Sequence, residues 1–253
     1  LVGRVVAEQQ DSLIVVTSAG AEVRIPRAAI VALELAAAST AAGRRGRPDP
    51  NYSRLLFAPT GTPLRQGEGY FSDYYVVFPG ISYGLTDRLS LMGGVSVVPA
   101  VGLDEQLFSV APRIGLYVSD QYAVSIGTLL VAFGGEGSGG IVFAIGTRGR
   151  PDKQVTVGLG WGYVNTNTDD VEFADYPILM VGGNVRLSDS MALVSENWFY
   201  MDPETTLDQQ PLGIALRFFG ERIAVDVGAI IVGEVISQGL PIPWLSFVYH
   251  FGR

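Results

Sequence analysis

The sequence predicts an all-β protein: an antiparallel up-and-down transmembrane β-barrel of about 12 strands that follows a small N-terminal β-module. From residue 54 to residue 251, segments of about ten residues alternate in polarity and are separated by small polar turns, as in membrane-spanning barrels. The mean hydropathy is +0.30, yet no run of about eighteen uncharged apolar residues marks a transmembrane helix. Short connections also alternate with longer ones, which is typical of outer-membrane barrels.

Within residues 88–98 and 222–232, an apolar face alternates with a face of small or charged residues. Because successive side chains of a strand point to opposite faces, we expect the apolar face to point outward to lipid. This outward set comprises Leu89, Leu91, Val95, Val97, Ile223, Val225 and Val227.

Composition excludes several classes of function. The 253 residues include no cysteine, so disulfides, thiolate metal sites and cysteine nucleophiles are excluded. The formal net charge of -8 argues against nucleic acid as the main partner. We expect no cofactor and no metal site. The chain opens at Leu1 inside a strand-like run, so we expect a processed or trimmed product.

Residues 1–35 are predicted to form the N-terminal module. The β-rich runs 2–6, 12–17 and 21–25 are separated by turns, and their rhythm resembles small SH3-like or Sm-like barrels. We expect a periplasmic plug or spacer, with specific ligand binding as the alternative. Residues 36–50 then form a linker in which Arg44, Arg45 and Arg47 make either a solvated hinge or a contact with anionic headgroups or another polyanion.

Residues 51–253 are predicted to form the barrel. Candidate strands begin near residues 53, 70, 88, 106, 121, 139, 153, 176, 190, 211, 222 and 241. Five connections, at 85–88, 118–121, 148–153, 187–190 and 220–222, are short, and we expect them on the periplasmic side. Counting back from the first short turn requires an earlier strand, for which residues 53–58 are the candidate, and makes residues 62–68 an external loop. Both ends of the barrel are then periplasmic.

Three stretches, residues 51–61, 67–71 and 81–91, together resemble a family of uncharacterised bacterial outer-membrane barrels. The closing residues 241–251 resemble the aromatic terminal strand that barrel-assembly machinery reads, with Tyr249 and Phe251 as the signal residues. The resemblance implies the outer membrane of a Gram-negative bacterium, with the lipid bilayer and the assembly machinery as partners. Assembly into a homo-oligomer is left as an open alternative.

Charged residues interrupt several predicted strands. An arginine on the lipid face near mid-membrane costs about 2–4 kcal/mol, so we expect these side chains to line the lumen. They are Arg113, Arg186, Glu196, Arg217 and Asp226. Opposite charges are expected to pair and narrow the lumen; alternatively, they line a polar path that biases which solutes pass.

Aromatic residues near strand ends suit the membrane interfaces, where Tyr and Trp favour the headgroup region. The interfacial candidates are Trp161, Tyr163, Trp198, Tyr200 and Trp244. The same residues would equally serve as core aromatics of a soluble barrel. The group from Tyr70 to Phe78 is too continuous for strict alternation.

No residue is expected to be catalytic. His250 and Ser246 lie four apart on one strand face, about 13 Å by strand rise, too far for a base and its nucleophile. Acids at 169, 170, 172 and 175 are read as solvated, with Ca²⁺ binding as the alternative. The glycine-rich run 134–140 is read as a mobile external hairpin, since it lacks the Lys and Ser/Thr of a phosphate loop.

The favoured function is therefore a passive small-solute pore or a structural envelope protein. Two alternatives remain: a soluble or surface-exported barrel that self-assembles, and a lipid-modifying barrel enzyme.

Overall fold

The computed structural model describes residues 3–17, 21–30, 49–134, 137–165, 171–236 and 240–252. The chain divides into two compact units, Leu1–Arg45 and Gly46–Arg253. In the described residues, no helix has the length and apolar character needed to cross a membrane. Most of the expected linker, including Arg44, Arg45 and Arg47, lies outside the described residues.

The first unit is a small antiparallel sheet. Strands β1 (Gly3–Glu8), β2 (Ser12–Thr17) and β3 (Glu22–Pro26) pair in the order β1-β2-β3, and the 3₁₀ turn η1 (Arg27–Ala29) follows. Leu13 and Val15 of β2 are buried. The three strands lie where the sequence predicts them, because each β-rich run is bounded by turn residues.

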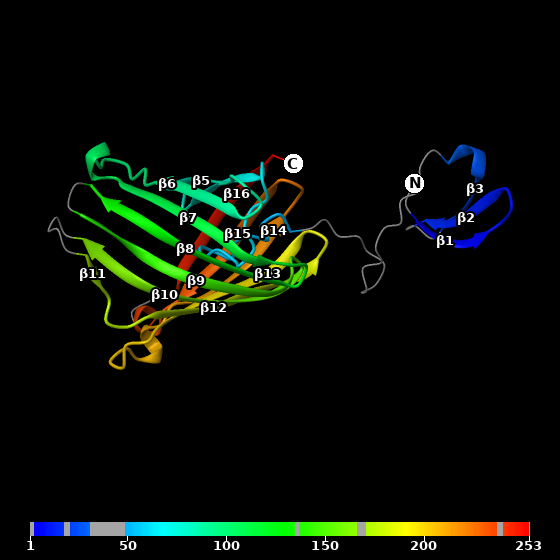
Figure 1. The fold of residues 1–253 in the computed structure, drawn as a ribbon. Helices are drawn as coiled ribbons and strands as arrows, with labels where there is room; N and C mark the ends of the chain where they lie inside the picture. Colours follow the sequence, from blue (N-terminus) through cyan, green and yellow to red (C-terminus); the bar gives the residue numbers. More distant parts are fainter. Residues whose placement is uncertain are drawn as a thin grey trace. The chain divides into compact units, whose positions relative to one another are not determined.

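The second unit is a closed antiparallel barrel of 12 strands, which confirms the predicted fold class (Figure 1). The strands are β4 (Gly69–Tyr74), β5 (Phe78–Gly84), β6 (Leu89–Val95), β7 (Leu107–Val118), β8 (Tyr122–Phe133), β9 (Ser138–Arg150), β10 (Lys153–Asn165), β12 (Ile178–Ser188), β13 (Met191–Tyr200), β14 (Leu212–Phe219), β15 (Ile223–Ile231) and β16 (Ile242–Phe251). Consecutive strands pair as hairpins, and β16 closes on β4, with Phe251 opposite Gly69. The two-residue strand β11 (Glu172–Phe173) extends the sheet beside Tyr163 of β10.

The connections differ at the two ends of the barrel. One end, called here the short-turn end, carries the turns 85–88, 119–121, 151–152, 189–190 and 220–222 together with the paired start of β4 and end of β16. The five short connections are thus confirmed. Of the described residues, the opposite, long-loop end carries 96–106 with η2 (Leu103–Glu105), 171–177, 201–211 with η3 (Leu207–Gln209), and 232–236 with α1 (Gly233–Ile236). Asp169 and Asp170, and part of the glycine-rich run, lie outside the described residues.

A tight turn at residues 75–77 divides the predicted strand at 70 into β4 and β5. Tyr75 and Val76 both have positive φ, at 55° and 66°, which bulky residues rarely adopt. The turn explains why the aromatic residues from Tyr70 to Phe78 do not alternate along a single strand.

The predicted first strand at 53–58 is wrong. Residues 49–64, called here the luminal plug, run inside the barrel and carry only an isolated bridge between Arg54 and Pro59. The predicted external loop 62–68 is also wrong, because Gly67 donates its amide to Gly84 O at 3.0 Å, at the short-turn end. The total of 12 strands still holds, since β4 and β5 are two strands where one was expected.

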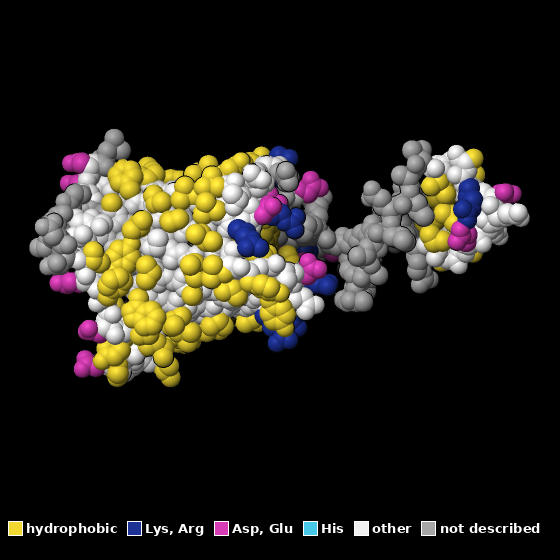
Figure 2. Space-filling model, viewed as in Figure 1, with side chains coloured by type: hydrophobic (Ala, Val, Ile, Leu, Met, Phe, Trp, Pro, Cys, Tyr) yellow, Lys and Arg dark blue, Asp and Glu magenta, His cyan; other side chains and the backbone are white. Residues whose placement is uncertain are grey.

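The outer face of the barrel is apolar. On the face drawn in Figure 2, apolar side chains cover the middle of the barrel and charged side chains gather at its ends. Leu91, Val97, Ile223 and Val227 of the expected outward set are exposed. Arg217 and Asp226, at 1% and 0% exposure, lie on the opposite, inner face.

Candidate functional site: the plugged lumen

The luminal plug is a loop that enters the barrel, turns and returns. Leu55 donates its amide to Ala58 O at 2.9 Å, and Thr60 donates to Ser53 O at 2.9 Å, so the chain reverses direction at residues 56–58, the tip of the plug. Because this loop pairs with no strand, its remaining backbone polar groups need other partners inside the lumen.

Glu196 of β13 holds the tip. Its Oε2 accepts the amides of Leu56, Phe57 and Ala58, each at 2.9 Å. Its other oxygen, Oε1, accepts the Trp198 indole N–H at 2.9 Å. The carboxylate is thus satisfied by four N–H donors, and such charge-assisted bonds are stronger than neutral ones.

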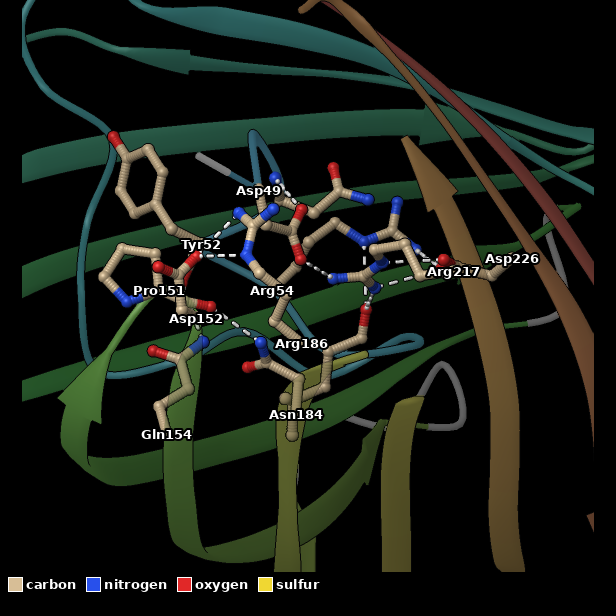
Figure 3. Close-up of polar contacts among 12 residues, drawn as sticks. Asp49, Tyr52, Arg54, Pro151, Asp152, Gln154, Asn184, Arg186, Arg217 and Asp226 are labelled. Carbon is tan, nitrogen blue, oxygen red and sulfur yellow. Dashed lines mark hydrogen bonds and ion pairs between the residues drawn. The ribbon is translucent and has the colours of Figure 1, made fainter. Parts of the chain in front are cut away.

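A cluster of two arginines and two aspartates holds the base of the plug (Figure 3). Arg217 of β14 lies opposite Asp226 of β15 in the ladder and donates to its oxygens at 2.7 and 3.0 Å. Arg217 also donates to Leu55 O at 2.6 Å and lies 3.4 Å from Asp49. Arg54 lies 3.9 Å from Asp226 and stacks over the Tyr74 ring at 5.1 Å. The charges balance, as a buried cluster requires.

Further side chains of the wall bind the plug backbone. Arg113 donates to Ser53 O at 3.2 Å and Thr60 O at 2.7 Å. Four other wall residues make single contacts: Ser125 with Gly61 O at 2.7 Å, Thr147 with Gly61 N at 2.8 Å, Ser90 with Leu64 N at 3.1 Å and Gln154 with Tyr52 O at 3.3 Å. Polar side chains spread around the wall thus replace the ladder that the plug lacks.

The plug also packs closely against the wall. A Cβ added at Gly61 would lie 2.4 Å from Ala123 O of β8. Leu55 lies against Gly182 of β12 in the same way, where an added Cβ would come within 2.5 Å of its Cδ1. Glycine at these positions lets plug and wall approach to contact distance.

At the foot of the plug, Tyr52 donates its hydroxyl to Glu68. Burial and this hydrogen bond raise the pKa of Tyr52 above its ordinary value, so the hydroxyl stays protonated and remains a donor.

Comparisons with known proteins add only distant likenesses. No family model matches the chain, and no curated protein matches it. Two solved structures of KdgM porin, one of them in complex with disordered oligogalacturonate, superpose with TM-scores of 0.46 and 0.45 at 9% and 8% identity. The alignments cover 74% and 73% of this chain and 98% and 95% of those chains. A structure described as "Asymmetric conductivity of engineered proteins" has a TM-score of 0.36 at 16% identity, over 69% of this chain and 55% of that one.

The structure brings four of the five expected lumen charges into the plug site: Arg113, Glu196, Arg217 and Asp226. Only Arg217 and Asp226 pair with each other, and they are ladder neighbours. The expectation that charges close the lumen by pairing across it is therefore corrected: they bind the plug, which occupies the space between them. Arg186 lies instead at the short-turn end, where it donates to Asp152 Oδ1 at 2.8 Å and to the carbonyls of Ser188 and Asp189.

Three of the five expected interfacial aromatics, Trp198, Tyr200 and Trp244, face the lumen. Trp198 donates to the inward Glu196, and Trp244 is only 6% exposed within the core cluster that contains Leu55 and Leu56. Tyr200 follows the same inward alternation on β13. Position near a strand end does not decide which face a side chain takes, whereas period-2 alternation does. Trp161 and Tyr163 alternate outward on β10.

Beyond the tip of the plug lies a cavity of about 540 Å³, called here the outer cavity. Its walls come from strand residues near the long-loop end, and Leu56 and Phe57 of the plug form its floor. The wall residues include Leu129, Val131, Ile141, Ile178, Trp198, Tyr200, Ile230 and Trp244. This apolar half of the lumen was not predicted, because the lumen was expected to carry small and polar residues.

The two residues considered for catalysis have other partners. His250 Nε2 lies 2.6 Å from Asn51 Oδ1 of the plug, and Ser246 donates to Asp226 at 3.0 Å. Both therefore belong to the network that binds the plug.

Proposed function

We propose that this chain is a non-enzymatic barrel of the outer membrane of a Gram-negative bacterium, a passive conduit for small solutes whose lumen is closed by the luminal plug. The observation that carries the proposal is the closed ladder with an apolar outer face and a plugged interior. In a bilayer every backbone polar group must be satisfied within the protein, which a closed barrel achieves and an open sheet does not.

The outer face supports a lipid environment in its detail. Large apolar side chains of the long strands are exposed outward, among them Ile114, Val124, Val157, Leu159 and Phe247. Strand charges at outward positions, such as Arg148 and Lys153, lie at the short-turn end, where they reach the headgroup region. Asp73 is an exception to this distribution of outward charges. Strand alternation places it outward, close to the turn that follows β4.

The size of the barrel supports a closed rather than an open pore. Barrels of about eight strands are filled by side chains, and those of about sixteen or more enclose an aqueous channel. Twelve strands leave room for side chains and one additional segment, and the plug supplies that segment.

The proposal extends to the partners and to the first unit. The plug enters the lumen at the short-turn end, where Asp49 meets Arg217 three residues before the turn 220–222. With that end periplasmic, residues 1–35 form a periplasmic module of SH3-like or Sm-like type. Tyr249 and Phe251 on the closing strand offer the aromatic signal to barrel-assembly machinery, and a homo-oligomer is compatible with the exposed outer face.

Planar lipid bilayers test the proposal. The full chain should give low conductance, and a form lacking residues 1–64 should give large, long-lived currents because the plug is gone. A form lacking residues 1–45 is the matched control, since it removes the first unit and keeps the plug. Large currents from the full chain, or equal currents from both truncated forms, would contradict closure by the plug.

Turnover of membrane lipid tests the non-enzymatic part. We expect the full chain to hydrolyse neither phospholipid nor lipid A, and the His250→Ala form to behave identically. Hydrolysis that disappears in the His250→Ala form would establish the enzyme alternative.

A further inference from the structure

The outer cavity differs chemically from the half of the lumen that holds the plug. The plug half is lined by Arg113, Ser125, Thr147, Arg217 and Asp226, each hydrogen-bonded to the plug or to a neighbour. The outer cavity is lined mainly by aliphatic and aromatic side chains and by glycines. The change occurs at the tip of the plug, residues 56–58.

The charged group beside the outer cavity is already occupied. Glu196 gives one oxygen to three plug amides and the other to Trp198, which uses up the Trp198 indole N–H as well. Among the lining side chains, the buried indole N–H of Trp244 has no hydrogen-bond partner. A polar solute that loses its hydration needs several such bonds, so its entry into this space is costly. Cavities lined by apolar side chains hold water poorly and bind apolar molecules instead.

The plug contributes apolar side chains to the floor of the outer cavity. Leu56 and Phe57 form the floor, and Phe57 keeps 47% of its surface exposed although it lies inside the barrel. A plug that served only to seal a polar channel would gain nothing from an apolar residue exposed at its tip. The exposed ring gains free energy when apolar surface covers it.

We propose that the outer cavity is a binding site for one uncharged, apolar small molecule, a hydrocarbon chain or ring system. Its volume of about 540 Å³ suits a small molecule, since ligand pockets typically span about 300–1,000 Å³. This proposal depends on the proposed function in one respect: the plug forms the floor of the cavity. It adds the chemical class of the solute that the barrel holds.

The protein carries its own probes of this site. Of its three tryptophans, Trp198 and Trp244 line the outer cavity, while Trp161 alternates outward on β10. A Trp161→Phe form therefore reports the cavity, and a Trp198→Phe/Trp244→Phe form reports the outer surface. Bromine quenches indole fluorescence on contact, so a medium-chain bromoalkane locates apolar binding.

The experiment uses the full chain in phosphatidylcholine vesicles, with the bromoalkane, brominated-acyl phosphatidylcholine and bromoethanol as quenchers. We expect the bromoalkane to quench the Trp161→Phe form along a saturating curve. Quenching of Trp161 by bilayer-dissolved probe should instead rise without saturation. Bromoethanol should quench the cavity tryptophans only weakly and without saturation.

Two cavity variants and one control make the test decisive. Val131→Phe/Ile230→Phe fills the cavity, and Ile141→Asn places an amide in it without adding volume. Each should weaken bromoalkane binding about tenfold or more. Val157→Phe/Val227→Phe adds slightly more bulk, but on the outer face, and should leave binding unchanged. Circular dichroism confirms that each form is folded.

The pattern of quenching identifies the source of the ligand and tests the proposal. If brominated phosphatidylcholine also quenches the cavity tryptophans, the ligand is an acyl chain of membrane lipid; if only the bromoalkane does, it is a free hydrocarbon. Absence of saturable quenching, or quenching unchanged in both cavity variants, would overturn the proposal. Unchanged conductance on removal of the plug would overturn the proposed function without affecting this quenching result.

Discussion

Glu196 shows how one side chain holds an irregular segment inside a barrel. Three consecutive amides at the tip of the plug converge on one carboxylate oxygen. Hydrogen bonds to charged groups contribute about 1.5–3 kcal/mol each, and a buried amide left without an acceptor costs about 1–3 kcal/mol. Loss of this carboxylate would therefore leave three amides at the tip without their acceptor and weaken the binding of the tip to the wall.

Replacing Glu196 with Ala should release the tip, because Leu56, Phe57 and Ala58 lose their common acceptor. We expect higher conductance in planar bilayers. Glu196→Gln keeps an acceptor oxygen but loses the charge, so its effect should be smaller. Glu204→Ala, on an exposed loop, is the control. Conductance of the Glu196→Ala form equal to that of the control would show that other contacts fix the tip.

The buried pair of Arg217 and Asp226 gives a second prediction at this scale. Arg217→Met leaves Asp226 and Asp49 without their main cation and should destabilise the folded barrel by about 3–5 kcal/mol. Arg217→Met/Asp226→Leu removes one charge of each sign from the cluster, so its formal charges balance again, and it should recover part of that loss. Denaturant unfolding in lipid vesicles measures both; a double variant no more stable than the single one would contradict the pairing.

At the scale of elements, local signals identify the strands but not the plug. The alternation in residues 88–98 and the small polar turn at 85–88 are set by neighbours in sequence, and both were predicted. The plug depends on partners far away along the chain: Leu56 meets Glu196 across 140 residues. No periodicity in a single sequence carries that contact, so the pattern of residues 53–58 predicts a strand where the structure has the plug.

At the candidate site, the sequence predicts the direction of the charged side chains but not their binding partners. Charges inside apolar strands, such as Arg217 and Asp226, predict an inward direction because lipid excludes them. What they bind depends on the plug, which the pattern does not reveal. The turn at Tyr75 and Val76 was missed for a related reason: it lacks the Gly or Asn that normally marks positive φ.

Close packing of the plug predicts a selective way to displace it. A methyl group at Gly61 would lie 2.4 Å from Ala123 O and 2.9 Å from Ala123 C, both backbone atoms that cannot move aside. Gly61→Ala should therefore displace the plug and raise conductance while the strands stay paired.

Gly146→Ala is the matched control for this change. It adds the same methyl group to β9, at a position where nothing lies within 4 Å. We expect its conductance to equal that of the unmodified chain. If Gly61→Ala gives the same low conductance as Gly146→Ala, the plug does not depend on its close contact with β8.

At the scale of the whole molecule, the barrel is ordered in two directions. From outside to inside, apolar side chains such as Val157 give way to polar ones such as Thr156. Along the lumen, the polar half that holds the plug gives way to the apolar outer cavity. The first change follows from strand alternation and agrees with the proposed lipid environment. The second separates the half that holds the plug from the half that contains the outer cavity.

A lipid surrounding predicts that the cost of a charge depends on its depth. Leu159 points outward at the middle of β10, the 13-residue strand Lys153–Asn165. Leu187 points outward on β12, beside the turn at 189–190. Arginine near the bilayer midplane costs about 2–4 kcal/mol, and near the interface about 0–1 kcal/mol.

Leu159→Arg should therefore destabilise the folded barrel in vesicles by about 2–4 kcal/mol, and Leu187→Arg by less than about 1 kcal/mol. Denaturant titration of both forms against the unmodified chain measures the difference. A self-assembling soluble barrel would bury its outer face against protein, with no midplane and no dependence on depth. Equal costs at the two positions, together with particles that sediment intact without detergent, would replace the membrane barrel with that assembly.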